Sequence, residues 1–237
     1  MRRLLLSTYS CLAVLFFCIS ISCSNPSAPA PPLEDVLFDD LEDAYSKQSA
    51  TELMKFYAMW QVSALPRQKR DIYNQSDEKI ALYEIYKVFY DPFNTELFST
   101  YYKDRVTYIV IQEKLGYSIG EDPELHYIED FRPPVSFRNA QILYLNESYD
   151  TVLNRFIEKQ STWERVKFLN RFVNIVPAHW FGWHIESFPY VFQIHLENDL
   201  CSAVVYFMKD FWQGGEARFI RNGTQWKMTE IKTTWIM

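Results

Sequence analysis

Residues 202–236 read SAVVYFMKDFWQGGEARFIRNGTQWKMTEIKTTWI, and this stretch decides the fold. It contains runs rich in β-branched and aromatic residues, which favour strands, at 202–211, 216–221 and 225–236. Gly214-Gly215 separates the first two runs, and Asn222-Gly223 separates the last two. Asn-Gly predicts a type I′ hairpin turn, because both central residues of that turn have positive φ. We therefore expect consecutive antiparallel strands in this stretch.

Further strands are predicted upstream. Runs at 179–186 and 190–197 flank Ser187-Phe188-Pro189, which extends the C-terminal strands to a four- to five-strand meander. The β-branched run at 105–112 and the apolar run at 141–145 predict two more strands. We expect no regular structure between residues 116 and 134.

Helical patterns fill the rest of the chain. Apolar residues recur at helical spacing from Leu33 to Ala44. SATE at 49–52 and STWE at 161–164 are capping boxes, each of which predicts the start of a helix. Separate helices and antiparallel strands predict an α+β fold, with N-terminal helices packed on a curved antiparallel sheet that ends in the meander. We assign residues 33–237 to a single domain.

The N-terminal residues have the pattern of an export signal. Arg2 and Arg3 precede an uncharged, mainly apolar stretch at 4–21, as in secretory signal peptides. Ser20–Cys23 (SISC) resembles a bacterial lipobox, which implies cleavage before Cys23 and acylation of its thiol, as with palmitate. The next residues, SNPSAPAPP, suit an extended leash. We assign residues 1–22 to a lipoprotein signal peptide and 23–32 to the lipidated cysteine and leash; the alternatives are ordinary secretion and a transmembrane span.

Net charge and composition limit the classes of molecule that the protein is expected to bind. Loss of Arg2 and Arg3 with the signal changes the formal net charge from −6 to −8, which disfavours nucleic acid as a partner. The lipid anchor is then the expected contact with the membrane. No acidic run follows Cys23, so we expect a protein of the bacterial cell envelope, anchored in the outer membrane and facing the periplasm. Cys201 lies in an apolar strand pattern and is expected to be buried.

The absence of common motifs argues against several chemistries. The sequence contains no glycine-rich phosphate loop, no GxSxG and no HExxH, so we expect no cofactor and no resident metal. The candidate catalytic side chains are two pairs, His184 with Glu186 and His195 with Glu197, each on one face of a strand. Paired in register, these strands would bring two imidazoles and two carboxylates together for acid–base chemistry or a divalent metal. The alternative is an ordinary polar sheet face.

Aromatic residues suggest a binding surface. Trp180, Trp183, Phe188, Tyr190, Phe192, Tyr206, Phe211 and Trp212 fall within the predicted strands and their connections. Such rings supply large contact areas for an apolar or sugar-like ligand. The candidate pocket residues are Trp180, Trp183, Tyr206, Trp212 and Arg218. The alternative is that these rings only fill the core, and that Glu216 and Arg218 form a surface ion pair.

The order of elements resembles that of the NTF2-like (cystatin-like) fold, on the residues LMKFYAMW at 53–60, AVVYF at 203–207, GGEA at 214–217 and WKM at 226–228. The whole chain also resembles envelope lipoproteins of Bacteroides-type bacteria. The second resemblance implies an envelope location and no activity. Our first hypothesis is a non-enzymatic module that uses an NTF2-like pocket or the sheet face to bind a small ligand or an envelope protein partner. The alternatives are a hydrolase or isomerase with a polar pocket near His184 and His195, and an inhibitor or accessory subunit of an envelope complex.

Overall fold

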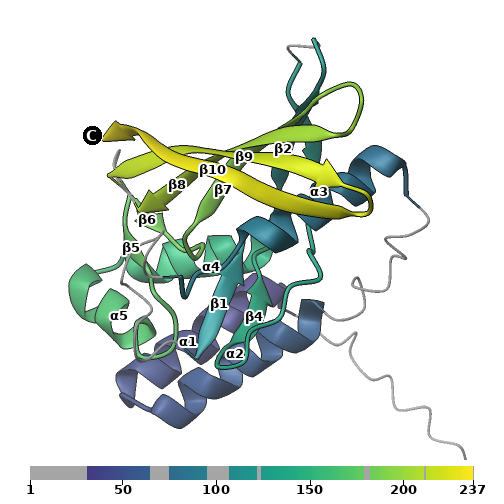
Figure 1. Ribbon diagram of the computed structural model, residues 1–237. Coiled ribbons are helices and arrows are strands. Elements are labelled where there is room, and N and C mark those ends of the chain that lie inside the picture. The colour runs from purple at the N-terminus through teal and green to yellow at the C-terminus, as the bar shows by residue number, and fades with distance from the viewer. Residues whose placement is uncertain are drawn as a thin grey trace, which may run out of the picture. The chain divides into compact units, whose positions relative to one another are not determined.

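The computed structural model describes residues 31–64, 75–94, 107–121, 124–178, 182–210 and 212–236. The predicted signal peptide, Cys23 and the candidate pocket residue Trp180 lie outside these residues. From Pro32 onward the chain forms one unit. Its elements are α1 (Leu33–Ser46), α2 (Ala50–Ala64), α3 (Asp77–Phe89), β1 (Tyr108–Ile111), β2 (Leu115–Ile119), β3 (His126–Ile128), β4 (Gln141–Tyr144), α4 (Glu147–Ile157), α5 (Thr162–Leu169), β5 (Val176–Pro177), β6 (Trp183–His184), β7 (Tyr190–Leu196), β8 (Ser202–Asp210), β9 (Gln213–Asn222) and β10 (Gln225–Ile236), as Figure 1 shows.

Helices α1 and α2 form an antiparallel hairpin over a three-residue connection. The Ser49 Oγ accepts a hydrogen bond from the backbone N–H of Glu52 at 3.2 Å, which confirms that this predicted cap starts α2. Trp60 is fully buried, and its indole N–H donates to the carbonyl oxygen of Tyr144 at 2.8 Å. This bond ties α2 to β4. Within the described part of the chain, no helix has both the length and the apolar character needed to cross a membrane.

The main sheet has the strand order β10-β9-β8-β7-β2-β3. Strands β7 to β10 are consecutive and antiparallel, which confirms the predicted C-terminal meander and the α+β fold class. The sheet as a whole is mixed, because β2 pairs with β7 in parallel. The expectation of no regular structure at 116–134 is therefore wrong. Strand β2 is short and contains a glycine, which weakens its strand pattern, and of its two partners β3 is close in sequence but β7 lies far downstream.

Strands β1 and β4 form a separate parallel ladder that stands between two apolar cores. Ile109 and Ile111 point into the core made with α3 and the main sheet. Tyr108 and Val110 point into the core made with α1, α2, α4 and α5. Burial on both faces is typical of parallel strands and explains the unbroken apolar run at 108–111.

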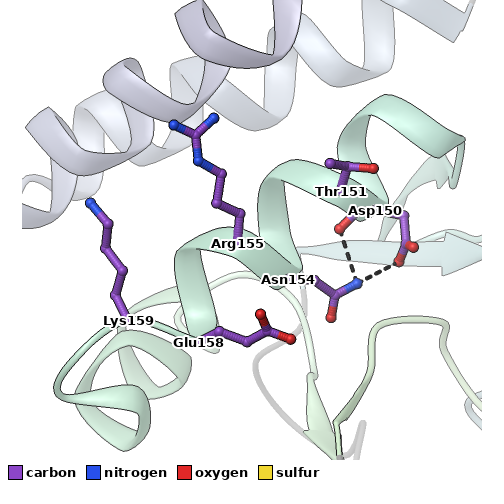
Figure 2. Close-up of a pocket in the computed structure, with 6 residues that line it drawn as sticks. All are labelled: Asp150, Thr151, Asn154, Arg155, Glu158 and Lys159. Atoms are coloured by element: carbon purple, nitrogen blue, oxygen red, sulfur yellow. Dashed lines mark hydrogen bonds between the residues drawn. The ribbon is translucent and has the colours of Figure 1, made fainter.

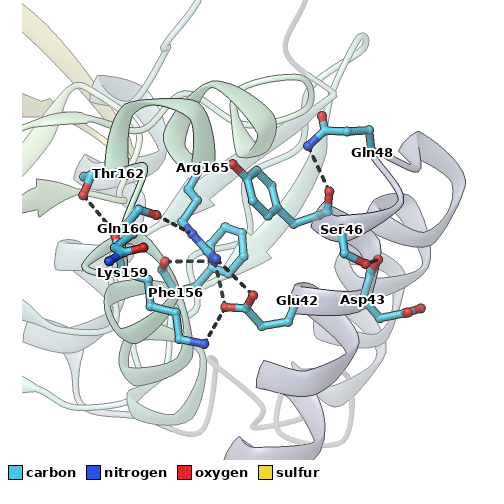
Figure 3. Close-up of polar contacts among 10 residues, drawn as sticks. Glu42, Asp43, Ser46, Gln48, Phe156, Lys159, Gln160, Thr162 and Arg165 are labelled. Carbon is cyan, nitrogen blue, oxygen red and sulfur yellow. Dashed lines mark hydrogen bonds and ion pairs between the residues drawn. The ribbon is translucent and has the colours of Figure 1, made fainter.

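The buried Arg165 joins α5 to α1 through an ion pair with the partly exposed Glu42 (Figure 3). Two guanidinium nitrogens lie 2.7 and 3.0 Å from the two carboxylate oxygens. The same guanidinium donates to the carbonyl oxygens of Gln160 and Phe156 and lies over the ring of Tyr45. Only 8% of Arg165 is exposed, so these contacts replace most of its hydration.

One predicted turn and one predicted helix cap need correction. Asn222 pairs with Gln225 across the last hairpin, so the turn consists of Gly223 and Thr224 and lies one residue later than expected. Gly223 has a φ of 62°, as the first central residue of a type II′ turn requires. Ser161 precedes α5, but its φ is 65° and its side chain makes no cap hydrogen bond, so the second capping box does not form.

Cys201 is exposed, and the expectation that it is buried is wrong. The residue lies just before β8 and not within it. Its thiol donates to the carbonyl oxygen of Asp199 at 3.3 Å, and its backbone N–H donates to the carboxylate of the same residue at 2.8 Å. The turn that connects β7 to β8 thus holds Cys201 at the surface.

Candidate functional site

One face of the main sheet points away from the helices, which lie on the other side in Figure 1. Ala203, Val205 and Phe207 of β8 point into the core, so Val204 and Tyr206 point outward. The register continues this face across the neighbouring strands. We define the outer sheet face as the side chains Ser118, Tyr127, Gln193, His195, Val204, Tyr206, Glu216, Arg218, Glu230 and Lys232.

Aromatic rings line one end of this face. Trp235 of β10 pairs with Gly214, and a Cβ on that glycine would lie 2.1 Å from the indole Cζ2. The indole centroid is 6.5 Å from the ring of Phe192, which is 43% exposed at a bulge in β7. Phe192 is 5.4 Å from Tyr190, and Tyr190 is 5.5 Å from the imidazole of His184. We call Trp235, Phe192, Tyr190 and His184 the aromatic row.

Tyr206 lies beside the aromatic row with polar groups on both sides. It is 38% exposed, and its direct cross-strand neighbours are Gln193 on β7 and Glu216 on β9. An amide and a carboxylate therefore flank a phenol ring. Such an arrangement offers hydrogen-bond donors and acceptors beside a flat apolar surface.

The aromatic row ends at a half-buried pair, His184 and Glu186. Their side chains are 15% and 22% exposed, and the imidazole Nδ1 lies 3.1 Å from the carboxylate Oε2. Burial would raise the pKa of Glu186, but hydrogen bonds from His184 and from the backbone outweigh burial and hold that pKa below its ordinary value. A carboxylate only accepts hydrogen bonds, so the Nδ1 carries the proton.

The charge of Glu186 affects its neighbours. Burial raises the pKa of Tyr190 to about 12, and the negative charge of Glu186 adds to this effect. Burial also raises the pKa of Asp150 on α4, and Glu186 again contributes by like-charge repulsion. The pair thus lies in a partly desolvated region that disfavours further negative charge.

A second polar group lies in the middle of the outer sheet face. The Ser118 Oγ is 2.9 Å from the Nδ1 of His195, and the Gln193 Nε2 donates to the same oxygen at 2.7 Å. Ser118 is only 4% exposed, because its neighbours cover it. The His195 Nε2 lies 3.8 Å from Glu197. These contacts hold β2 against β7 and satisfy a buried hydroxyl.

The far side of the outer sheet face is an ion-pair ladder. The Glu216 carboxylate accepts from Lys232 at 2.7 Å and from Arg218 at 3.2 Å, and Arg218 also lies 3.4 Å from Glu230. Hydrogen bonds from Lys232 and then Arg218 lower the pKa of Glu216, against a smaller opposing effect of burial. Arg218 and Glu216 thus form a surface ion pair, the alternative that the sequence left open.

The four predicted catalytic side chains do not converge through strand pairing. Of the expected strand at 179–186, the structure describes residues 182–186, and among these only Trp183 and His184 form a strand, β6, which pairs with β5 and not with β7. Strand β7 pairs instead with β2 and β8, so His195 faces Ser118. Among the side chains that the structure describes, no three His, Cys, Asp or Glu residues are placed to hold a metal ion.

The predicted pocket residues that the structure describes do not form one pocket either. Tyr206 and Arg218 lie on the outer sheet face. Trp183 packs instead against the helical core and contacts Trp163 edge to face at 5.1 Å. Trp212 lies in the turn between β8 and β9 and is 46% exposed.

A hollow of about 540 Å³ along α4 is a competing site (Figure 2). Its cations are already paired: Arg155 lies 2.7 Å from Asp35 on α1, and Lys159 lies 3.0 Å from Glu42. In Figure 2 both basic side chains reach towards α1, away from Asp150. We therefore assign no ligand to this hollow.

Comparison with protein-family models, with curated proteins and with solved structures finds no match. The resemblance to NTF2-like proteins and to envelope lipoproteins stays a prediction. Function is inferred from the geometry of the outer sheet face.

Trp235, Ser118 and Gln193 are parts of this site that the sequence analysis does not identify. Trp235 had a usable signal, because alternation from the buried Trp226 places it on the opposite face of the strand. Ser118 and Gln193 meet only because β2 and β7 pair in parallel. Nothing local in either segment indicates that pairing.

Proposed function

We propose that this protein is a lipid-anchored module of the bacterial cell envelope that binds a small sugar-like ligand without chemical turnover. The aromatic row, with Tyr206 beside it, carries the proposal. Its rings are held in place by packing against one another and remain partly accessible. Sugar rings have apolar faces and polar edges, and this site offers aromatic surface next to an amide and a carboxylate.

The openness of the surface favours binding over catalysis. Phe192 and Tyr206 are 43% and 38% exposed, and the groups around them belong to strands of a continuous sheet. Enzymes usually exclude water from reacting groups, whereas an open face leaves a bound ligand partly in solvent.

The test is a binding titration of residues 24–237 with a panel of neutral and acidic oligosaccharides, followed by tryptophan fluorescence and calorimetry. We expect Phe192→Ala and Tyr206→Ala to weaken binding at least about tenfold each, since burying an aromatic ring against the ligand contributes roughly 1.5–3 kcal/mol. Trp163→Ala is the matched control, because this ring is 65% exposed but lies on α5. Binding that is absent, or that is equal in all variants, would reject the proposal.

A hydrolase is the second candidate, favoured by the His184–Glu186 pair. Since the Nδ1 is protonated towards Glu186, the Nε2 of the neutral ring is an acceptor, as in a general base. Turnover of p-nitrophenyl esters or glycosides that disappears in His184→Ala, with folding intact, would favour this candidate. Our proposal expects no turnover in either protein.

The lipid anchor is supported by the lipobox resemblance at Ser20–Cys23 and by the proline-rich leash. We propose the outer membrane, on its periplasmic side, as the location. Labelled palmitate fed to a bacterial host tests the anchor: the full chain should take up label and the Cys23→Ser variant should not. Equal labelling of both would contradict acylation at this residue.

A further inference from the structure

Exposed apolar side chains gather at one end of the α1–α2 hairpin. Leu33 and Val36, in the first turns of α1, are 57% and 41% exposed. Met59 and Val62, in the last turns of α2, are 42% and 61% exposed. Because the helices run antiparallel, these turns lie at the same end of the hairpin. We call these four side chains the hairpin end.

Two carboxylates in the first turn of α1 are paired away from this apolar surface, whereas Asp39 and Asp40, one turn further along, are exposed. Glu34 accepts a hydrogen bond from the Ser148 Oγ at 2.6 Å. Asp35 lies 2.7 Å from a guanidinium nitrogen of Arg155. Both partners belong to α4, so the acidic groups of the first turn face α4. The outward side of the same turn is left to Leu33 and Val36.

The leash reaches the domain at this same end. It runs from Cys23 to Pro32, directly before Leu33. A proline-rich chain spans about 3.1 Å per residue, so ten residues reach roughly 30 Å. A domain of about 200 residues is on the order of 40 Å across. A leash shorter than the domain keeps the hairpin end nearer to the anchor than the opposite side.

We propose that the hairpin end rests on the lipid bilayer and orients the domain there, an inference that builds on the proposed acylation of Cys23. Apolar side chains gain by leaving water for the acyl boundary, and the paired carboxylates beside them face α4. In Figure 1 the hairpin and the outer sheet face lie on opposite sides of the domain. Contact through the hairpin end therefore leaves the aromatic row open to the aqueous phase.

The experiment uses the full acylated chain in vesicles of phosphatidylethanolamine and phosphatidylglycerol that carry nitroxide-labelled acyl chains. In a Cys201→Ser background, a fluorophore is attached at Val62→Cys or, as a control, at Ile220→Cys, which is also exposed but lies on β9. We expect the nitroxide to quench the fluorophore at position 62 and not at position 220. Equal quenching at both positions, or none at position 62, overturns the proposal.

A second set of variants separates orientation from anchoring. Val36→Asp with Met59→Asp should remove the quenching at position 62, while the protein still floats with the vesicles. Val88→Asp, at a similarly exposed site on α3, should leave it unchanged. A chain that does not float overturns this inference together with the anchor. Sugar binding, measured on residues 24–237 in solution, is independent of both results.

Discussion

The indole of Trp235 occupies the space beside Gly214 that any larger side chain would need. A Cβ at position 214 would lie 2.1 Å from the indole Cζ2 and 2.4 Å from the carbonyl oxygen of Phe207. The glycine thus allows β9 to pass beneath a large ring at the edge of the outer sheet face. The position of Trp235 in the aromatic row depends on that close approach.

Gly214→Ala is expected to lower the free energy of unfolding by about 1–3 kcal/mol, as overpacking does, and to displace the indole. Urea unfolding measures the first effect, and the NMR shift of the Trp235 indole N–H, assigned with the Trp235→Ala protein, measures the second. The same substitution in a Trp235→Ala background should cost less, since only the contact with the Phe207 carbonyl remains. An unchanged free energy of unfolding in Gly214→Ala would contradict the packing described.

Glu186→Gln tests the carboxylate–imidazole pair. The folded-state pKa of Glu186 lies below its ordinary value of 4.5, so its ionised form stabilises the fold above that value. This stabilisation is lost as the pH falls through the folded-state pKa. We expect Glu186→Gln to cost about 1–2 kcal/mol at neutral pH and progressively less below pH 4.5. Urea unfolding over a pH series checks this, and a difference that is constant with pH would contradict it.

Glu186→Gln should also change the pKa of Asp150, which lies on α4. Repulsion by Glu186 contributes, after burial, to the raised pKa of Asp150. Glu186→Gln removes that charge, so the pKa of Asp150 should fall towards its ordinary value. Carbon-detected NMR of the Asp150 carboxyl measures the shift, and Glu158→Gln on the same helix is the control.

Local patterns predicted the parts of the fold whose partners are close in sequence. The runs from Tyr190 to Ile236 form consecutive hairpins, and Ser49 starts α2 as its capping box indicates. Parallel pairing is different, because its hydrogen bonds join distant segments. Gly116 lies opposite Gln193 in the parallel pair of β2 and β7, and no turn signal connects the two residues.

In the candidate site too, residues whose strands are neighbours in sequence were easier to predict than residues brought together by distant segments. Tyr206 and Arg218 were both named as candidate pocket residues, and the antiparallel register of β8 and β9 places them on the same face. His184 and His195 were expected on paired strands, but hydrogen bonds between Ser187 and β1 take the place of that pairing. The backbone N–H and the Oγ of Ser187 both bond to Val110 of β1, which draws the segment after β6 away from β7. Such a tertiary contact has no sequence pattern.

Arg165→Met is expected to lower the free energy of unfolding by about 3 kcal/mol. It removes the buried partner of an ion pair and leaves the Glu42 carboxylate, which is 25% exposed, short of its closest donors. Lys159→Met is the matched control, because Lys159 reaches the same carboxylate from a position 47% exposed. That loss should stay below about 1 kcal/mol. Equal losses in the two variants would show that Arg165 is no more than a surface partner.

Ser118→Ala distinguishes a structural hydroxyl from a nucleophile. The substitution leaves the Gln193 amide and the His195 imidazole without their shared partner, and we expect a loss of about 1–2 kcal/mol in unfolding free energy. Ser202→Ala, on β8, removes neither of these hydrogen bonds and serves as the control. Because Ser118 is 4% exposed and accepts a hydrogen bond from Gln193, we expect no reaction of its hydroxyl with a fluorophosphonate probe. Labelling of the native protein that disappears in Ser118→Ala would instead make the Ser118–His195 pair a catalytic site.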